Sequence, residues 1–112
     1  MTMRFDELPA FQKERKRLGK KYKSLADDLR EFRNVVSVIL LGNSKHFHVI
    51  TQTGALHIVK ARLFCRYLKG SSLRVIYAWR EENRQIEFIE LYDKKRTENE
   101  DRDRIREYLD NH

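Results

Sequence analysis

The most strand-like stretch of the chain, KARLFCRYLKGSSLRVIYAW at residues 60–79, contains five cationic side chains, and four of them lie in its two strand-like runs. Three of them are Arg62, Arg66 and Arg74, and arginine stays protonated, which suits it to hold and stabilise negative charge. The fourth is Lys60, and a lysine crowded by like charges can serve as a base. These residue types predict that the stretch binds an anionic group such as a phosphate, and they could also catalyse a reaction at it.

The charge of the chain is concentrated in its middle. The net charge is +7, yet residues 35–74 hold six Lys or Arg and no acid, whereas residues 75–112 hold eight Lys or Arg and eleven acids. The acid-free segment also contains His46, His48 and His57. A positive field over one region indicates a polyanionic partner, and nucleic acid is the commonest one.

Several classes of protein are disfavoured by the same sequence. No apolar run approaches the ~20 residues that a membrane span needs, and MTMRFDELPAF has no apolar secretory segment. Cys65 is the single cysteine, so we expect a buried thiol, no intrachain disulfide and a cytoplasmic location. His46 and His48 form a conceivable metal pair, but no Cys or acid lies near them in sequence. We therefore predict solvated histidines, no metal and no cofactor.

The first half of the chain has the pattern of a helical hairpin within a single domain, residues 1–112. Apolar side chains recur three, four or seven positions apart, and Ser24 followed by Asp27 resembles a helix start, which splits the run near residues 19–23. The positions that form this stripe are Phe11, Leu18, Tyr22, Leu25, Leu29, Phe32 and Val36.

The second half predicts an antiparallel three-strand meander followed by a helix. β-Branched and aromatic residues cluster at His57–Leu68, Ser72–Glu81 and Gln85–Tyr92, with short turn-like links between them. Residues 43–57 read as a loop with at most a short strand, and a further short strand at Met3–Asp6 is compatible with the pattern. The predicted fold class is α+β, with the helical hairpin packed on this small sheet.

Strand alternation predicts where the cations point. Lys60, Arg62, Phe64 and Arg66 share one face of the first strand, and apolar residues share the other. Arg74, with Lys69 at the turn, extends the cationic face, and the third strand ends in Tyr92-Asp93-Lys94-Lys95-Arg96. Glu87 and Glu90 are an alternative explanation, as cross-strand partners of these cations, but two acids leave a surplus of positive charge.

The chain resembles the RelE/ParE superfamily of toxin–antitoxin toxins. The stretches that carry the resemblance are residues 60–79, with their SLRVIYA strand, then IEFIELYDKKR at 86–96, and FQKERKRLGKKYKSLADDL upstream at 11–29. In the RelE branch the resemblance implies cleavage of mRNA on the ribosome without a metal, through attack by the ribose 2′-OH. The implied partners are a cognate antitoxin, the ribosome and mRNA.

The resemblance also implies roles for individual residues. Arg74 stands where RelE-like enzymes contact phosphate, with Arg66 and Arg62 on the preceding strand. A further catalytic group is expected just after the last strand, from Tyr92, Lys94, Lys95 or Arg96, and Lys60 and Lys95 are candidate bases. The catalytic candidates are Arg66, Arg74, Tyr92 and Lys95, and the RNA-binding candidates are Lys60, Arg62, Lys69, Lys94 and Arg96. A ParE-like, non-enzymatic gyrase inhibitor and a basic RNA- or ribosome-binding module without catalysis are the alternatives.

Overall fold

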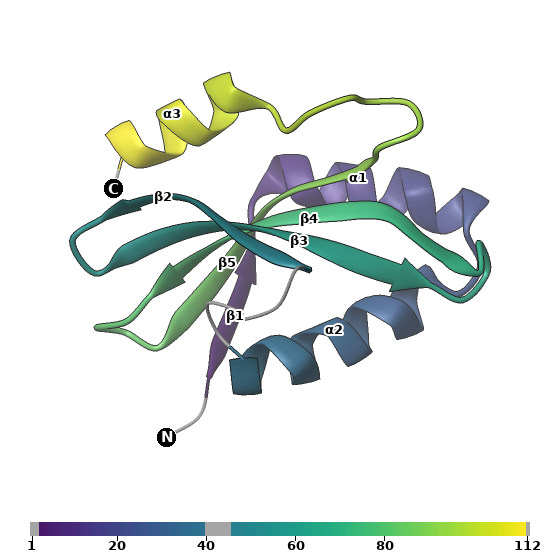
Figure 1. Ribbon diagram of the computed structural model, residues 1–112, viewed down its shortest axis with the longest axis horizontal. Coiled ribbons are helices and arrows are strands. Elements are labelled where there is room, and N and C mark those ends of the chain that lie inside the picture. Colours follow the sequence, from purple (N-terminus) through teal and green to yellow (C-terminus); the bar gives the residue numbers. More distant parts are fainter. Residues whose placement is uncertain (1–2, 40–45, 112) are drawn as a thin grey trace.

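The computed structural model describes residues 3–39 and 46–111 and contains eight elements in those ranges. A short strand precedes two helices, four longer strands follow, and a helix ends the chain (Figure 1). In chain order the elements are β1 (Arg4–Glu7), α1 (Pro9–Lys21), α2 (Leu25–Ile39), β2 (Phe47–Thr53), β3 (Leu56–Cys65), β4 (Gly70–Arg80), β5 (Gln85–Asp93) and α3 (Arg102–Asp110).

The sheet has five strands in the order β1-β5-β4-β3-β2, so the predicted three-strand meander is wrong. The α+β class and the helical hairpin hold, and β3, β4 and β5 do form the antiparallel core of the sheet. The segment at Arg4–Glu7 adds a strand parallel to β5, which makes the sheet mixed. A second added strand, β2, pairs with β3 at the opposite edge.

The strand β2 was missed because its alternation is weak. His48, Thr51 and Gln52 interrupt the apolar residues, and a register shift between Val49 and Thr51 breaks the period of two. Gly54 then takes a φ of +59° in the turn to β3, a left-handed conformation that glycine adopts without strain. Residues 43–45 of the expected loop lie outside the described residues.

The two N-terminal helices cover one face of the sheet, with α1 against β5 and α2 against β3. Their predicted apolar stripe is buried from Phe11 to Val36, as expected. It packs on strand residues such as Leu63, Val75 and Phe88. The helix α2 begins at Leu25, directly after Ser24, as predicted, and the Ser24 hydroxyl donates to the Asp28 carboxylate at 2.7 Å.

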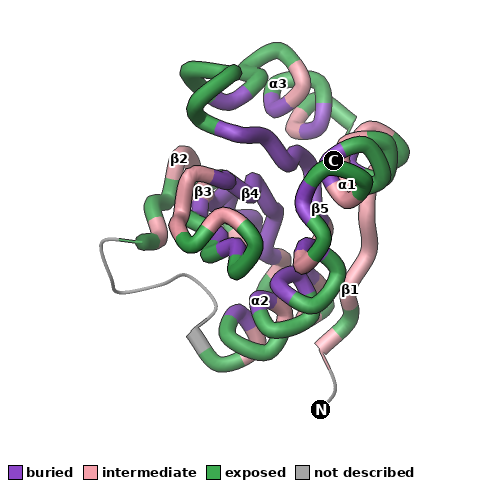
Figure 2. The backbone as a smooth tube through the Cα atoms, turned by 90° about the vertical axis from the view of Figure 1, so that its right-hand side faces the viewer, coloured by how far each residue is buried: buried purple, intermediate pink, exposed green. Residues whose placement is uncertain are grey.

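The helix α3 packs on part of the opposite face, so that face is not simply an open surface. Ile105 and Tyr108 form a second buried cluster with strand residues that include Ile76 and Ile89. Figure 2 shows the sheet between α3 on one side and α2 on the other. Within the described residues, no helix is both long enough and apolar enough to cross a membrane.

Candidate functional site

The cations that the sequence places in adjacent strands meet in a row across the sheet. Arg62 of β3 is directly opposite Arg74 of β4, and Arg74 is opposite Tyr92 of β5. Directly paired residues project from the same face of a sheet, so these three side chains are neighbours. The face is the one that α3 partly covers, since Tyr92 packs in the same cluster as Ile105.

A second row runs parallel to the first. His48 of β2 is opposite Lys60 of β3, which is opposite Ile76 of β4, which in turn is opposite Glu90 of β5. The Lys60 ammonium donates to Glu100 Oε1 at 2.9 Å, and the Glu100 side chain is only 2% exposed. The acidic segment before α3 therefore reaches back to the cationic face.

Residues of the two rows, together with His46 and Lys94, line a cavity of about 200 Å³. Four cations and two imidazoles line it: Lys60, Arg62, Arg74, Lys94, His46 and His48. We call this cavity the basic pocket. Its lining contains no carboxylate, so an anion entering it meets positive charge on several sides.

Arg74 is fixed at the floor of this pocket. It is 9% exposed, and its Nη1 donates to the carbonyl oxygens of Ser71 and, at 3.1 Å, Leu73. Within the described residues it forms no ion pair with a carboxylate. Burial and the neighbouring Arg62 charge lower the pKa of Arg74 from its usual high value. A buried guanidinium without a carboxylate partner is suited to receive a phosphate.

Tyr92 is suited to donate a hydrogen bond and not to act as a base. Burial, with the charges of Glu100 and Glu90, raises the pKa of Tyr92 to about 12. The phenol therefore keeps its proton at neutral pH.

The two predicted acidic partners of the cations are engaged elsewhere. Glu87 accepts a hydrogen bond from the Tyr108 hydroxyl at 2.8 Å, and Glu90 accepts one from the Asp101 backbone N–H, also at 2.8 Å. Burial raises the pKa of Glu90. The acid that does pair with a cation of this face is Glu100, which pairs with Lys60 and comes from a segment that sequence reasoning did not connect with the sheet.

Arg66 does not join Arg62 and Arg74, and the expectation that it shares their face is wrong. The register shifts between Leu63 and Cys65, and β3 ends at Cys65. The Arg66 guanidinium pairs with Glu31 of α2, on the side that the helical hairpin covers. Alternation predicts direction only while a strand stays regular.

The remaining predicted cations are spread around the end of the sheet. Lys94 lines the basic pocket, while Lys69 is exposed at the β3–β4 turn with a φ of 54°. Lys95 and Arg96 are exposed just after β5, where their backbone N–H groups donate to Asp93. Arg96 and Tyr92 line a different cavity, beside α1.

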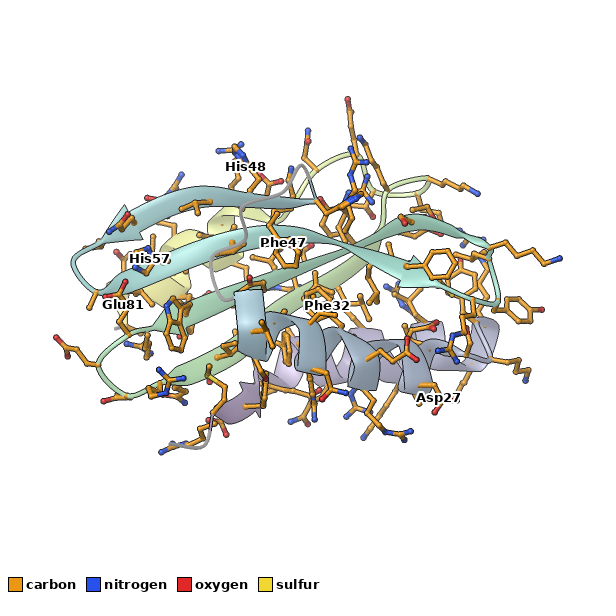
Figure 3. All side chains as sticks on the ribbon, turned by 60° about the horizontal axis from the view of Figure 1, so that its bottom comes forward. Asp27, Phe32, Phe47, His48, His57 and Glu81 are labelled. Carbon is orange, nitrogen blue, oxygen red and sulfur yellow. The ribbon has the colours of Figure 1, made fainter. Side chains whose placement is uncertain are left out.

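His46 and His48, which the sequence predicts to be solvated, are both exposed; His46 lies in the turn before β2, and His48 lies in β2 and not in a loop. Phe47 packs inward on Phe32 of α2, with ring centroids 6.2 Å apart, so its neighbours in the extended chain point the other way. Figure 3 shows Phe47 directed toward Phe32 while His48 projects from the opposite side of β2. An aromatic between two histidines was the available signal for this arrangement.

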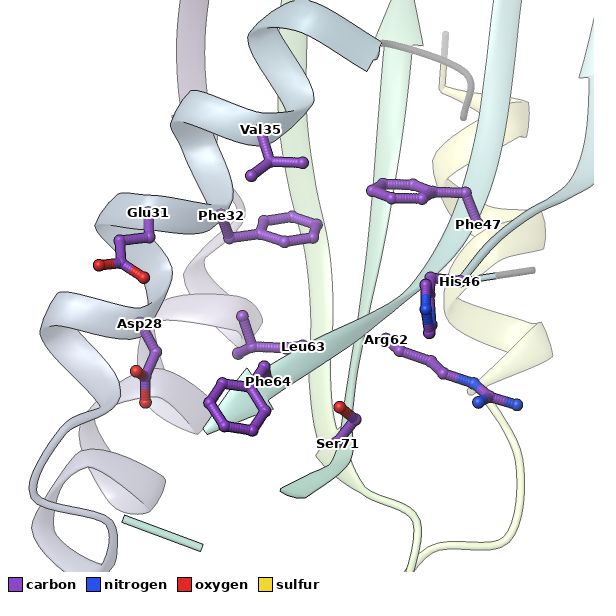
Figure 4. A pocket seen from close by; sticks show the side chains of 10 residues that line it. All are labelled: Asp28, Glu31, Phe32, Val35, His46, Phe47, Arg62, Leu63, Phe64 and Ser71. Carbon is purple, nitrogen blue, oxygen red and sulfur yellow. The ribbon is translucent and has the colours of Figure 1, made fainter. Parts of the chain in front are cut away.

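A second, apolar cavity of about 260 Å³ lies between α2 and β3. Phe32, Leu63 and Phe64 line its interior, and His46 and Arg62 line its rim (Figure 4). Both rim residues also line the basic pocket, so they stand between the two cavities.

Comparison with known proteins identifies the fold. No protein-family model matches the chain, and no curated protein matches it. Among solved structures, the chain is similar to one in the archaeal RelE–RelB complex from Pyrococcus horikoshii OT3. The two are 23% identical over 87% of this chain and 100% of that chain, with a TM-score of 0.65. This likeness shows a shared fold, and it is the fold that the resemblance to the RelE/ParE superfamily implied.

Proposed function

We propose that the protein is the toxin of a toxin–antitoxin system and that it inhibits translation by cutting mRNA on the ribosome. Two observations support the proposal. The fold is similar to that in the archaeal RelE–RelB complex, and the face of its sheet carries the basic pocket. The observation that carries the catalytic part is the row formed by Arg62, Arg74 and Tyr92 across three strands.

The row fits the chemistry of RNA cleavage by an internal nucleophile. The ribose 2′-OH attacks the adjacent phosphorus, negative charge builds on the phosphate oxygens, and the 5′-oxygen leaves. Arg74 and Arg62 stabilise that charge without needing a metal. Tyr92 donates a hydrogen bond or stacks on a base. Lys60, Lys69, Lys94, Lys95 and Arg96 bind the flanking backbone by charge.

The proposal excludes Arg66 from the catalytic group, because its guanidinium pairs with Glu31 of α2. It places the protein in the cytoplasm, where ribosomes and mRNA are available, with a cognate antitoxin as its protein partner.

Induced expression in a bacterial host tests the function. We expect growth arrest with a rapid fall in amino-acid incorporation and new mRNA 5′ ends within coding sequence. The alternative outcomes are distinct: loss of DNA supercoiling with intact mRNA indicates a ParE-like gyrase inhibitor, and binding to ribosomes without cleavage indicates a non-catalytic module. Either result contradicts the proposal.

A further inference from the structure

The basic pocket holds several groups that stabilise charge, but proton transfer needs a different kind of side chain. Arginine is protonated at all relevant pH values. The Lys60 ammonium donates a hydrogen bond to Glu100, and Tyr92 keeps its proton because its pKa is raised to about 12. Imidazole both takes and gives a proton near neutral pH, and two imidazoles line the pocket, those of His46 and His48.

Both histidines lie on the pocket side of the sheet, His48 within β2 and His46 directly before it. The Arg62 N–H donates to the His46 carbonyl oxygen at 2.9 Å, and His48 is directly opposite Lys60. Residues two apart in an extended chain point the same way, and Phe47 between them is anchored on α2. The register shift in β2 begins only after Val49, so it does not disturb this pair.

The distance to the arginines is short. Neighbouring strands lie about 4.8 Å apart, so the backbone of His46 is roughly 10 Å from that of Arg74, two strands away. Side chains from both strands can converge on one phosphodiester across that span. Figure 4 shows the His46 and Arg62 side chains next to each other at the rim away from α2.

We infer that His46 and His48 are the two proton-transfer residues of this site, one acting as general base and the other as general acid. The inference rests on the proposed function. One imidazole removes the proton of the ribose 2′-OH as its oxygen bonds to phosphorus. The other, as imidazolium, gives a proton to the 5′-oxygen as the bond from phosphorus to that oxygen breaks. The products are a 2′,3′-cyclic phosphate and a free 5′-hydroxyl, and no further reactant is consumed.

A metal site is a poorer explanation of the same histidines. Their neighbours are cations, which repel a divalent metal. Among the described residues, no three His, Cys, Asp or Glu side chains gather into a group that suits a metal.

The pH dependence of cleavage tests the inference. The charged and titratable groups that face the pair from the neighbouring elements are Lys60, Arg62, Arg74, Tyr92, Lys94, Glu90 and Glu100. Imidazole ordinarily titrates between about pH 5 and 8, so a limb of a bell-shaped profile in that range that disappears when a histidine is replaced reports that imidazole, whereas a limb that persists in both histidine variants belongs to another group such as Glu90.

The experiment measures cleavage rates on ribosome-bound mRNA from pH 5 to 8.5 for the unaltered chain, His46→Ala, His48→Ala and the double variant. In each single variant we expect the cleavage rate to stop depending on pH on one side of the optimum, because the group that titrates there is gone. The double variant should cleave about 10²–10⁴-fold more slowly than the unaltered chain. RNA affinity should change little, because the cations supply it. Gln52→Ala, on β2 outside the pocket lining, is the control and should cut normally.

The possible outcomes distinguish failure of the histidine roles from failure of the proposed function. If the unaltered chain cuts and the double variant retains its rate and its bell-shaped profile, the inference is overturned while the proposed function stands. If the unaltered chain does not cut, both are overturned. A double variant that loses cleavage and RNA binding together has lost the site's structure, and His46→Gln with His48→Gln then decides. Restored binding with no cleavage upholds the inference, and restored cleavage overturns it.

Discussion

Lys60 and Glu100 form an ion pair at 2.9 Å that joins the acid-free middle of the chain to its acidic C-terminal segment. The lysine lines the basic pocket, and the glutamate is buried in the segment that leads into α3. Desolvation acts to raise the pKa of Glu100, but the hydrogen bond and charge of Lys60 outweigh it, so the pKa lies below its usual value. One carboxylate of the chain itself thus competes with an incoming anion for a pocket cation.

Glu100→Gln should therefore strengthen RNA binding. The variant removes the carboxylate charge that pairs with the Lys60 ammonium, so we expect affinity for a single-stranded RNA to rise several-fold at low salt, with a steeper salt dependence. Fluorescence anisotropy across a salt series measures it. Glu98→Gln, exposed in the same segment, is the matched control. Equal affinities for the two variants would show that Glu100 does not compete with RNA.

The same variant should alter acid stability. Because the pKa of Glu100 is depressed on folding, its contribution is present above the ordinary glutamate pKa and is lost as the pH falls through the folded value. We expect Glu100→Gln to be less stable than the parent by about 1–3 kcal/mol at pH 7, and the gap to narrow toward pH 3. Urea unfolding at several pH values checks this, and a gap independent of pH would refute it.

Arg104 holds α3 against the rest of the domain. Its guanidinium donates to both carboxylate oxygens of Glu14 at 3.0 Å and to the Ile89 carbonyl at 2.9 Å. Arg104→Met should cost about 2–4 kcal/mol of stability and speed hydrogen exchange in α3 more than in α2. Arg106→Met is the control, since Arg106 is exposed and its ion pair with Asp103, at 3.7 Å, lies at the surface. If Arg104→Met speeds hydrogen exchange equally in α2 and α3, Arg104 does not hold α3 in place locally.

Tyr22 anchors the end of β5, just before the basic run that follows it. Its hydroxyl donates to Asp93 Oδ2 at 2.6 Å, and this bond, with burial, raises the pKa of Tyr22 to about 12. A raised pKa means that its contribution is complete below pH 10 and is lost as the pH rises toward 12. Tyr22→Phe should be about 1–3 kcal/mol less stable at pH 7 and lose less stability between pH 10 and 12 than the parent. If the parent and Tyr22→Phe lose the same stability between pH 10 and 12, the Tyr22–Asp93 hydrogen bond does not contribute as described.

Periodicity in the sequence predicted the helices and the three central strands, because those elements bury one regular face. The helical stripe from Phe11 to Val36 and the apolar side of β3 are buried as expected, except that Tyr67 lies exposed beyond the strand. The edge strand β2 was not predicted, because a bulge and polar residues obscure its two-residue alternation of apolar side chains. The contacts of α3 and of the segment before it were not predicted, because a pair of residues far apart in sequence, such as Lys60 and Glu100, leaves no pattern in the local sequence.

The site was predicted in part for the same reason. Arg62, Arg74 and Tyr92 sit in regular strands, so alternation placed them together. Arg66 follows an irregularity in register, and its partner lies on a helix. The position of His48 opposite Lys60 depends on the pairing of β2 with β3, which the sequence did not predict.

Cleavage of mRNA on purified, programmed ribosomes tests the central claim most directly. The comparison is the unaltered chain, Arg62→Met with Arg74→Met, and Arg66→Met as a control that removes an arginine from outside the basic pocket. We predict cleavage by the parent and by Arg66→Met, and a loss of about 10²–10³-fold or more in the double variant, with its fold intact by circular dichroism. Equal cleavage by the double variant and the parent would contradict the account, because the row across the sheet would then have no part in the reaction.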